Sequence, residues 1–498
     1  MLENNQVVES QHLNLDYSFQ GLTLEDIRAF AAKKLPDNFD ELRLQLLKGE
    51  FVNQTENKCV THTLCRSFHS VVRAGNGKNR FNEIVRLLRS GKWLGATGKP
   101  ITDVVNIGVG GSDLGSMMSS FALKEFADDA SLHNLKVHFV SSMDGGQLYA
   151  VLPIVDPETT LFIIASKSFT TTDTFANVNT VKSWIEHTLS EDQWLTRHVI
   201  GVSANNQGMT DFGIPPAQQL SFGDTVGGRY SIWSAIGLPI ALTIGSHQFG
   251  RMLDGAQQMD EHFAYLPLEQ NIPMLMAVIG AYNRESRQIN NLAILPYDGR
   301  LRYMPSYLQQ LDMESNGKQT NFRNEPIDYP TGPIIWGGFG PNGQHAFFQH
   351  LHQGYDEFTA DFIAILHRNA PGFDFGVQTS LREQQRLAVA NCLAHRRLMW
   401  FGDAQPEDPR HHYRGQRPNN LIFMDELTPT SFGALLAAYE HKVFTQGLMW
   451  QINSFDQPGV ELGKKVAVDI LAAIDHIDID GQPEGTFDAS TDHIIRRM

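Results

Sequence analysis

The sequence predicts an α/β fold with two units, each a mainly parallel sheet flanked by helices, together with a helical N-terminal region and a helical C-terminal tail. The chain has 498 residues, so two domains, or one large domain with insertions, are expected. From about residue 100, short apolar runs alternate with longer segments of helical spacing. A second series of the same kind follows, and this alternation is typical of α/β domains.

The N-terminal hundred residues show helical spacing in LRLQLLKGEFV and NRFNEIVRLLRSGKW, at residues 42–52 and 79–93. The first β-rich series then begins. Its four runs are continuous and apolar, which suits strands that are buried on both faces of a parallel sheet. They are VVNIGVGG, KVHFVSS, TLFIIAS and HVIGVSAN, starting at Val104, Lys136, Thr160 and His198.

The second series follows a boundary near residue 245. Its runs are NLAILPYD, GPIIWGGFG, DFIAIL and NLIFM, and helical segments such as SLREQQRLAVANCLAHRRLMWF separate them. Another helical stretch, KKVAVDILAAI, lies near the C-terminus. We therefore predict a smaller domain at residues 97–245, a larger domain from residues 1–96 and 246–455, and a C-terminal segment at residues 456–498.

Charge and composition exclude several classes of protein. The formal charge of −15 disfavours general binding to nucleic acid or to an anionic membrane surface. Three cysteines are too few for a disulfide framework, and the N-terminus does not resemble a secretory signal, so we expect a cytoplasmic protein. The apolar run at residues 231–245 is short for a membrane span and contains Gly237 and Pro239, so it predicts a buried segment.

The segment NIGVGGSDLG follows the first strand of the first series. Gly108, Gly110 and Gly111 permit tight turns, and Ser112 and Asp113 could cap the next helix, whose N-terminus would attract an anion. The segment lacks the third glycine of the dinucleotide fingerprint and the Lys-Ser/Thr of a P-loop. A plain turn between strand and helix is an equal alternative.

The segment ASKSFTTTDT follows the strand TLFII, at the strand end where open α/β sheets bind ligands. Its hydroxyls and one ammonium group are what a phosphate monoester requires. The alternative is a Ser/Thr-rich helix start with a capping role. The groups concerned are those of Ser166, Lys167, Ser168, Thr170 and Thr171.

Three further charged groups are weaker candidates. Arg229 precedes an apolar segment and needs an anionic partner, which could be a structural carboxylate or a substrate. His345 lies near His350 and His352, but their spacing does not match a metal motif, so one acid–base histidine is more plausible than three metal ligands. Lys464 by itself is compatible with a solvated helix face.

Seven segments occur in the order, and at roughly the separations, found in one family: TENKCVTH, NIGVGGSDLG, SKSFTT, VGGRYS, QQLDMESNGK, NGQHAF and INSFDQPGVELGK. The sequence thus resembles the glucose-6-phosphate isomerase (phosphoglucose isomerase) family. That resemblance implies two sugar-isomerase α/β domains, a homodimer, and no metal or organic cofactor. It also implies interconversion of glucose 6-phosphate and fructose 6-phosphate, in glycolysis and gluconeogenesis, by proton transfer through an enediol(ate).

The resemblance also implies a role for each site residue. Glu314 matches the base that moves the proton, and Arg229 matches the cation that stabilises the enediolate. His345 and Lys464 match the groups that open the sugar ring. The substrate-binding positions are Gly111, Ser112, Ser166, Lys167, Ser168, Thr170, Thr171 and Gln310, with Ser166, Lys167, Ser168 and Thr171 around the phosphate.

This sequence departs from the family pattern at a few positions. Ser168 replaces the usual Thr and keeps the hydroxyl, whereas Pro458 replaces the usual Trp and could move the segment that carries Lys464. None of the departures removes a catalytic residue. Three alternative functions remain: an isomerase that also accepts mannose 6-phosphate, a sugar-phosphate-sensing module, and a secreted signalling role. No basic recognition helix supports the second and no export signal supports the third.

Overall fold

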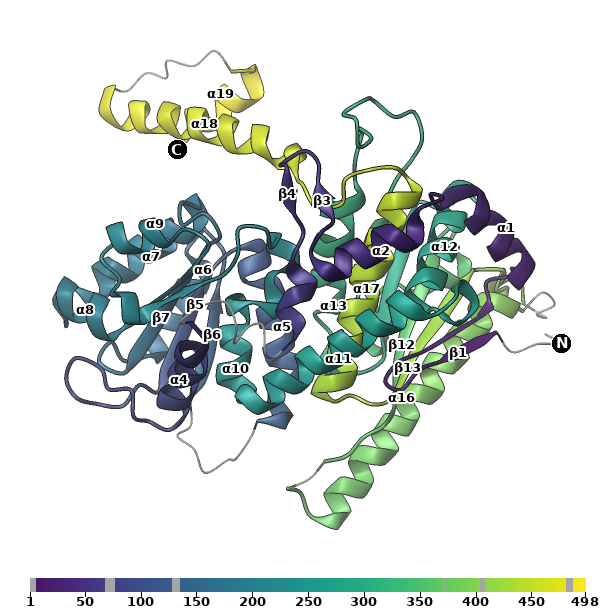
Figure 1. Cartoon of the computed structure of the whole chain (residues 1–498), viewed down its shortest axis with the longest axis horizontal. Coiled ribbons are helices and arrows are strands. Elements are labelled where there is room, and N and C mark those ends of the chain that lie inside the picture. The colour runs from purple at the N-terminus through teal and green to yellow at the C-terminus, as the bar shows by residue number, and fades with distance from the viewer. Residues whose placement is uncertain (1–5, 68–76, 128–134, 371, 404–407, 481–486) are drawn as a thin grey trace. The chain divides into compact units, whose positions relative to one another are not determined.

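The computed structural model describes residues 6–67, 77–127, 135–370, 372–403, 408–480 and 487–498. The chain divides into two compact units, Met1–Ser454 and Phe455–Met498. In its described residues the first unit contains a six-stranded sheet, a five-stranded sheet and a two-stranded sheet, shown in Figure 1, and the predicted α/β class is confirmed. The domain boundaries at residues 97, 245 and 455 stay predictions.

The smaller sheet has five strands in the order β6-β5-β7-β8-β9, and every neighbouring pair is parallel. All residues of β5, β7 and β8 are buried, as the continuous apolar runs predicted. Its strands are β5 (Asp103–Ile107), β6 (Lys136–Val140), β7 (Thr160–Ala165), β8 (Val199–Ser203) and β9 (Gln219–Ser221). Its helices are α4 (Gly77–Arg89), α5 (Leu114–Leu123), α6 (Gly146–Val151), α7 (Thr172–Ile185), α8 (Glu191–Arg197) and α9 (Asn206–Asp211).

The larger sheet has six strands in the order β1-β2-β13-β12-β10-β11. The four strands of the second series are parallel, whereas β2 pairs with β13 in the antiparallel sense. The strands are β1 (Val7–Glu9), β2 (Asn14–Phe19), β10 (Asn291–Pro296), β11 (Ile334–Gly337), β12 (Thr359–His367) and β13 (Asn419–Glu426).

The helical expectation for the N-terminal region is confirmed by α2 (Phe39–Lys48) and α4, and the strands β1 and β2 precede these helices. In β2, the side chains of Leu15 and Tyr17 are buried, while Asn14 and Asp16 are partly exposed. This alternation fits a strand with one covered face. The pair covers an edge of β13 that would otherwise present unpaired backbone groups.

The helix α17 (Pro429–Met449) lies in the interior of the first unit, because the described side chains along almost its whole length are buried. It crosses α11 (Ser246–Tyr265) at very close range: a Cβ on Gly433 would overlap the carbonyl oxygen of Met252, and one on Gly255 would overlap that of Thr430. Figure 1 shows the two helices side by side. Glycines at the crossing therefore allow the two backbones to touch.

The predicted buried segment at residues 231–245 is confirmed: two 3₁₀ turns lead into α10 (Leu238–Ile244), and nearly every side chain is buried. Within the described residues, no helix has both the length and the apolar character needed to cross a membrane. The remaining elements of this unit are α1 (Leu24–Lys34), α2 (Phe39–Lys48), β3 (Val52–Asn53), β4 (Lys58–Cys59), α12 (Ile272–Glu285), α13 (Met304–Leu308), α14 (Gly340–Gly343), α15 (Phe348–Gln353) and α16 (Phe375–Phe401).

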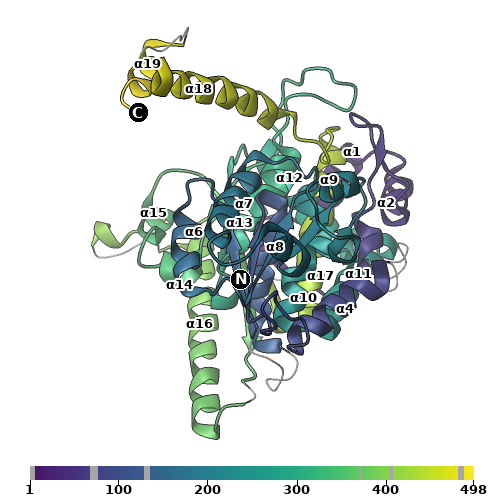
Figure 2. The same cartoon turned by 90° about the vertical axis from the view of Figure 1, so that its left-hand side faces the viewer.

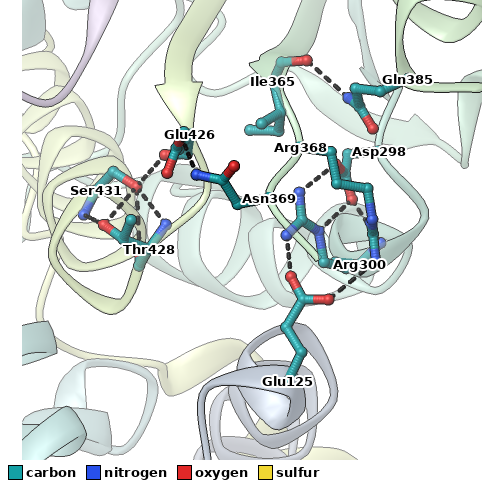
Figure 3. Close-up of polar contacts among 10 residues, drawn as sticks. All are labelled: Glu125, Asp298, Arg300, Ile365, Arg368, Asn369, Gln385, Glu426, Thr428 and Ser431. Carbon is teal, nitrogen blue, oxygen red and sulfur yellow. Dashed lines mark hydrogen bonds and ion pairs between the residues drawn. The ribbon is translucent and has the colours of Figure 1, made fainter. Parts of the chain in front are cut away.

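A group of charges joins the two sheets, as Figure 3 shows. Glu125, which follows α5, accepts hydrogen bonds from Arg300 and from Arg368, the latter at 2.9 Å. Arg300 follows β10 and Arg368 follows β12. Asp298 holds Arg300 through bonds of 2.9 Å to Nε and 2.7 Å to Nη2. One carboxylate of the smaller-sheet region thus links two strand ends of the larger sheet.

The C-terminal unit consists mainly of α18 (Glu461–Asp480) and α19 (Ala489–Ile495). Pro458 opens a 3₁₀ turn, Pro458–Val460, that runs directly into α18. Proline is well tolerated at the start of a helical segment, because the amide hydrogen that it lacks has no partner there. The effect of Pro458 on the position of Lys464 stays a prediction.

Candidate active site

The loops that follow β5 and β7 lie next to each other at the carboxyl ends of these strands in the smaller sheet. Ile107 pairs with Ile164, so the two parallel strands end side by side. A Cβ on Gly108 would stand 3.0 Å from the carbonyl oxygen of Ala165. The glycine loop and the hydroxyl-rich loop, which sequence analysis treated as separate motifs, are therefore neighbours.

The glycine loop also contacts the segments that carry Arg229 and Gln310. Gly111 lies against Gly228 so closely that a Cβ on Gly111 would overlap the Gly228 carbonyl oxygen. Gly110 has φ +57°, in the left-handed region that favours glycine, and a Cβ there would stand 3.0 Å from Nε2 of Gln310. The structure thus brings Gly111, Ser112, Arg229 and Gln310 into one region.

The capping role expected for Ser112 and Asp113 is wrong. Ser112 belongs to a 3₁₀ turn, and Asp113 occupies the N-cap position of α5 without any side-chain bond to the helix backbone. Instead, Asp113 is buried, and this burial raises the pKa of its carboxyl group to about 6, while a hydrogen bond from Ser141 partly opposes the rise. The helix amides of α5 are therefore left without a side-chain cap.

The hydroxyl-rich loop is held by bonds among its own side chains. The hydroxyls of Ser166 and Thr171 lie 2.9 Å apart, and those of Thr170 and Ser168 are also 2.9 Å apart. Phe169 between them has φ 57°, a strained value for an aromatic residue, and its side chain is buried. Strain of this kind often marks a functional loop. Thr171 stands at the N-cap of the 14-residue helix α7 and makes no cap bond.

Lys167 supplies the positive charge of this loop. Burial lowers the pKa of its ammonium group, and the nearby charges of Lys58 and Arg229 lower it further, whereas Glu56 and Asp224 raise it. Lys58 is paired with Asp224 at 2.9 Å. Because the charge of Arg229 affects the pKa of Lys167, the two cations belong to the same region.

Glu314 ends a short π-helix, Gln309–Glu314, that continues from α13. Such single π-turns are frequent at functional sites. The Glu314 carboxylate lies 3.2 Å from Nη1 of Arg229; its side chain is 25% exposed, whereas that of Arg229 is 2% exposed. A buried cation thus faces a carboxylate that a ligand can reach.

The π-helix is held from two directions by lysines that sequence analysis did not single out. Lys318 donates to the carbonyl oxygens of Glu314, at 2.7 Å, and Ser315, at 2.8 Å. The buried Lys442 of α17 donates to Asp312 at 2.6 Å. No local pattern distinguishes these lysines, because their partners are defined by helix geometry and tertiary packing.

The roles of the two remaining predicted residues, His345 and Lys464, stay predictions. His345 lies in an exposed turn between α14 and α15, and none of its described hydrogen bonds reaches Glu314 or Arg229. Lys464 belongs to the C-terminal unit, where its exposed ammonium pairs with Glu461 at 2.8 Å. In the described parts of the chain, no three His, Cys, Asp or Glu side chains are placed to hold a metal ion.

The chain is similar to known proteins over nearly its whole length. A family model described as phosphoglucose isomerase matches residues 16–495. The glucose-6-phosphate isomerase of Idiomarina loihiensis is 66% identical over 487 residues, which cover 98% of this chain and 99% of that protein. The glucose-6-phosphate isomerase of Psychrobacter cryohalolentis is 44% identical over 519 residues, covering 98% of this chain and 91% of that protein.

Solved structures agree with the sequence relatives. A crystal structure of a glucose-6-phosphate isomerase from Chlamydia trachomatis matches with a TM-score of 0.82 at 28% identity, covering 94% of this chain and 90% of that one. A crystal structure of a hypothetical protein from Thermus thermophilus matches with a TM-score of 0.68 at 22% identity, covering 92% of this chain and all of that one, and shows the fold alone.

Proposed function

The chain belongs to the phosphoglucose isomerase family and therefore interconverts glucose 6-phosphate and fructose 6-phosphate, a step of glycolysis and gluconeogenesis; we propose that Glu314 moves the proton between C1 and C2. The observation that carries this proposal is the pair that Glu314 forms with the buried Arg229. Removal of a proton next to the carbonyl leaves negative charge on the sugar oxygens. A pre-placed guanidinium stabilises that charge without reorganisation.

The phosphate of the substrate binds, in this proposal, at the loop between β7 and α7. Support comes from the hydroxyls of Ser166, Ser168, Thr170 and Thr171, the ammonium group of Lys167, and the uncapped start of α7. The neighbouring glycine loop and Gln310 then bind the sugar. This assignment accounts for the strained backbone at Phe169, because a rigid loop presents its donors at fixed positions.

Ring opening is assigned to His345 and Lys464, on the resemblance of their segments to the family pattern. A histidine can both give and accept a proton near neutral pH. Its exposed position leaves the imidazole of His345 accessible to a substrate or to a second copy of the chain.

We also propose a homodimer and a cytoplasmic location. The projecting helix α16, visible at the bottom of Figure 2, exposes large apolar side chains: Phe375 is 80% exposed, Leu387 65% and Phe401 50%. Such side chains favour association with another protein surface. The three cysteines are unpaired, which supports a reducing compartment. Light scattering of the purified chain tests the dimer.

Replacement of the proposed base tests the mechanism. Glu314→Gln removes the proton acceptor but keeps the shape of the side chain, so we expect kcat to fall by about 1,000-fold with little change in KM. The measurement is conversion of fructose 6-phosphate to glucose 6-phosphate in a coupled assay that contains a chelator. Glu261→Gln, on the exposed face of α11, is the matched control. A Glu314→Gln variant with wild-type turnover would exclude the assignment.

A further inference from the structure

We propose that Ser315 and Tyr230 are positioning residues that fix the guanidinium of Arg229 beside Glu314 through a closed ring of hydrogen bonds. This inference rests on the proposed function and deepens it. Nε of Arg229 donates to the Ser315 hydroxyl at 2.6 Å, and Nη2 donates to the Ser454 carbonyl oxygen at 2.7 Å. The Tyr230 hydroxyl lies 2.9 Å from that of Ser315 and donates to the same Ser454 oxygen at 3.4 Å.

The chemistry of the groups determines the direction of the bonds that Arg229 makes in this ring. Arginine only donates, so the Ser315 oxygen accepts from Nε. Either hydroxyl can donate in the bond between Tyr230 and Ser315: if Tyr230 donates to Ser454, its oxygen accepts from Ser315, and if it donates to Ser315, the longer contact to Ser454 is given up. In both cases Nε and Nη2 keep their two acceptors, and these hold Arg229 in one orientation.

Burial makes this ring rigid. Ser315 is 0% exposed, Tyr230 1% and Ser454 3%. Burial is also the main reason why the pKa of Tyr230 is raised, which keeps its hydroxyl protonated and able to donate. Hydrogen bonds in such a site are not exchanged with water, so their geometry persists while charge develops on the substrate.

Asn316, the residue after Ser315, binds Ser454, which is the remaining member of the ring. The Ser454 hydroxyl donates to Oδ1 of Asn316 at 2.7 Å, and Nδ2 of Asn316 donates to the Val443 carbonyl oxygen at 3.1 Å. The three consecutive residues Glu314, Ser315 and Asn316 therefore have different tasks. The first faces Nη1 of Arg229, the second binds Nε, and the third fixes the carbonyl group that binds Nη2.

Two substitutions and two matched controls test the ring. Tyr230→Phe and Ser315→Ala each remove one hydroxyl. Tyr307→Phe and Ser119→Ala remove hydroxyls that are equally buried but have no hydrogen-bond partner among the described residues. We expect kcat to fall about tenfold in Ser315→Ala and about threefold in Tyr230→Phe, with KM within about twofold of the wild type, because the ring acts on the developing charge. Both controls should retain wild-type kcat.

Two competitive inhibitors separate positioning of charge from general damage to the site. A phosphorylated aldonate carries a carboxylate where the enediolate carries its charge, whereas an alditol phosphate has only hydroxyls there. The inhibition constant of the aldonate should rise by about the same factor as kcat falls, and that of the alditol phosphate should not change. In the double variant the loss should be smaller than the product of the single losses, because both hydroxyls belong to one ring.

Several results would overturn the inference. One is unchanged kcat in both variants; another is equal weakening of both inhibitors, which indicates a purely structural role. If Ser315→Ala does not fold, Tyr230→Phe, which preserves the aromatic ring, decides the question alone. Failure of the proposed function is separate: it appears as undiminished turnover in Glu314→Gln, whatever the behaviour of the ring variants.

Discussion

At the scale of single residues, the site combines groups that are placed by very different means. Glu314 and Arg229 form a pair at 3.2 Å between a carboxylate that ligands can reach and a cation that is almost fully buried. The cation is oriented by neutral hydroxyl and carbonyl groups. Because these groups carry no net charge, they do not compete with the substrate for the guanidinium as a second carboxylate would.

Asp113 gives a prediction about pH. Burial raises its pKa from 3.8 to about 6, so between these values the folded chain holds a proton that the unfolded chain has lost. The contribution of this group to stability is present below about pH 4 and is lost as the pH rises through 6. Asp113→Asn should therefore be more stable than the wild type by about 2 kcal/mol at pH 7.5, and nearly equal to it at pH 4.

Denaturant titrations at the two pH values measure this difference. Asp254→Asn, on the exposed face of α11, is the control and should show no pH-dependent gain. Equal effects of Asp113→Asn at both pH values would mean that the carboxyl group is not perturbed in the folded chain.

At the scale of elements, the strands of both parallel series could be predicted, because burial on two faces forces continuous apolar runs such as TLFII in β7. The N-terminal strands could not be found in this way. NLDYSF in β2 alternates partly exposed and buried side chains only over residues 14–17, and it precedes longer helical patterns. Its partner β13 is distant in sequence, so no local signal identifies the pairing.

The same limit applies to the candidate site. The motifs containing Glu314, Arg229 and Ser166 could be recognised from their order along the chain. The contribution of Ser315, Tyr230 and Ser454 depends on how three separate segments meet, and Asp113 has the sequence position of a helix cap although it does not cap α5. Residue type and spacing indicate what a side chain can do, whereas its partners are determined by tertiary packing.

The crossing of α11 and α17 gives a prediction about helix packing. In Gly433→Ala the new Cβ would overlap the Met252 carbonyl oxygen, so we expect a loss of about 2 kcal/mol or more in the free energy of unfolding. Gly463→Ala in α18 is the control: a Cβ there meets nothing within 4 Å, and alanine should stabilise the helix by about 0.5 to 1 kcal/mol. Thermal or denaturant unfolding measures both. A stabilising Gly433→Ala would show that the helices can move apart at no cost.

At the scale of the whole first unit, Glu125 connects the five-stranded and the six-stranded sheet through Arg300 and Arg368. Its side chain is 33% exposed, and those of Arg300 and Arg368 are 11% and 24% exposed. Charge-assisted bonds at this degree of burial are stronger than those of a fully solvated pair. The two sheets should therefore resist separation at this point.

Replacement of this carboxylate measures the strength of the connection. Glu125→Gln should lower the free energy of unfolding by about 1 to 2 kcal/mol, because two arginines lose a charged acceptor. Glu158→Gln, which breaks the pair with the 52% exposed Lys99, should change it by less than about 1 kcal/mol. Equal, small effects in denaturant titrations would mean that the two sheets are held by apolar packing alone.

The pairing of β2 with β13 has a consequence for the synthesis of the chain. The side chains of Gln20 and Asn420 in this region are hydrogen-bonded although 400 residues separate them. At a translation rate of roughly 10 residues per second, the N-terminal strands wait about 40 seconds for their partner to leave the ribosome. The five strands of the smaller sheet come from residues 103–221 alone and can assemble during that interval. Until β13 has been synthesised, β1 and β2 therefore have no sheet to join. At this stage the nascent chain depends most on protection by a chaperone.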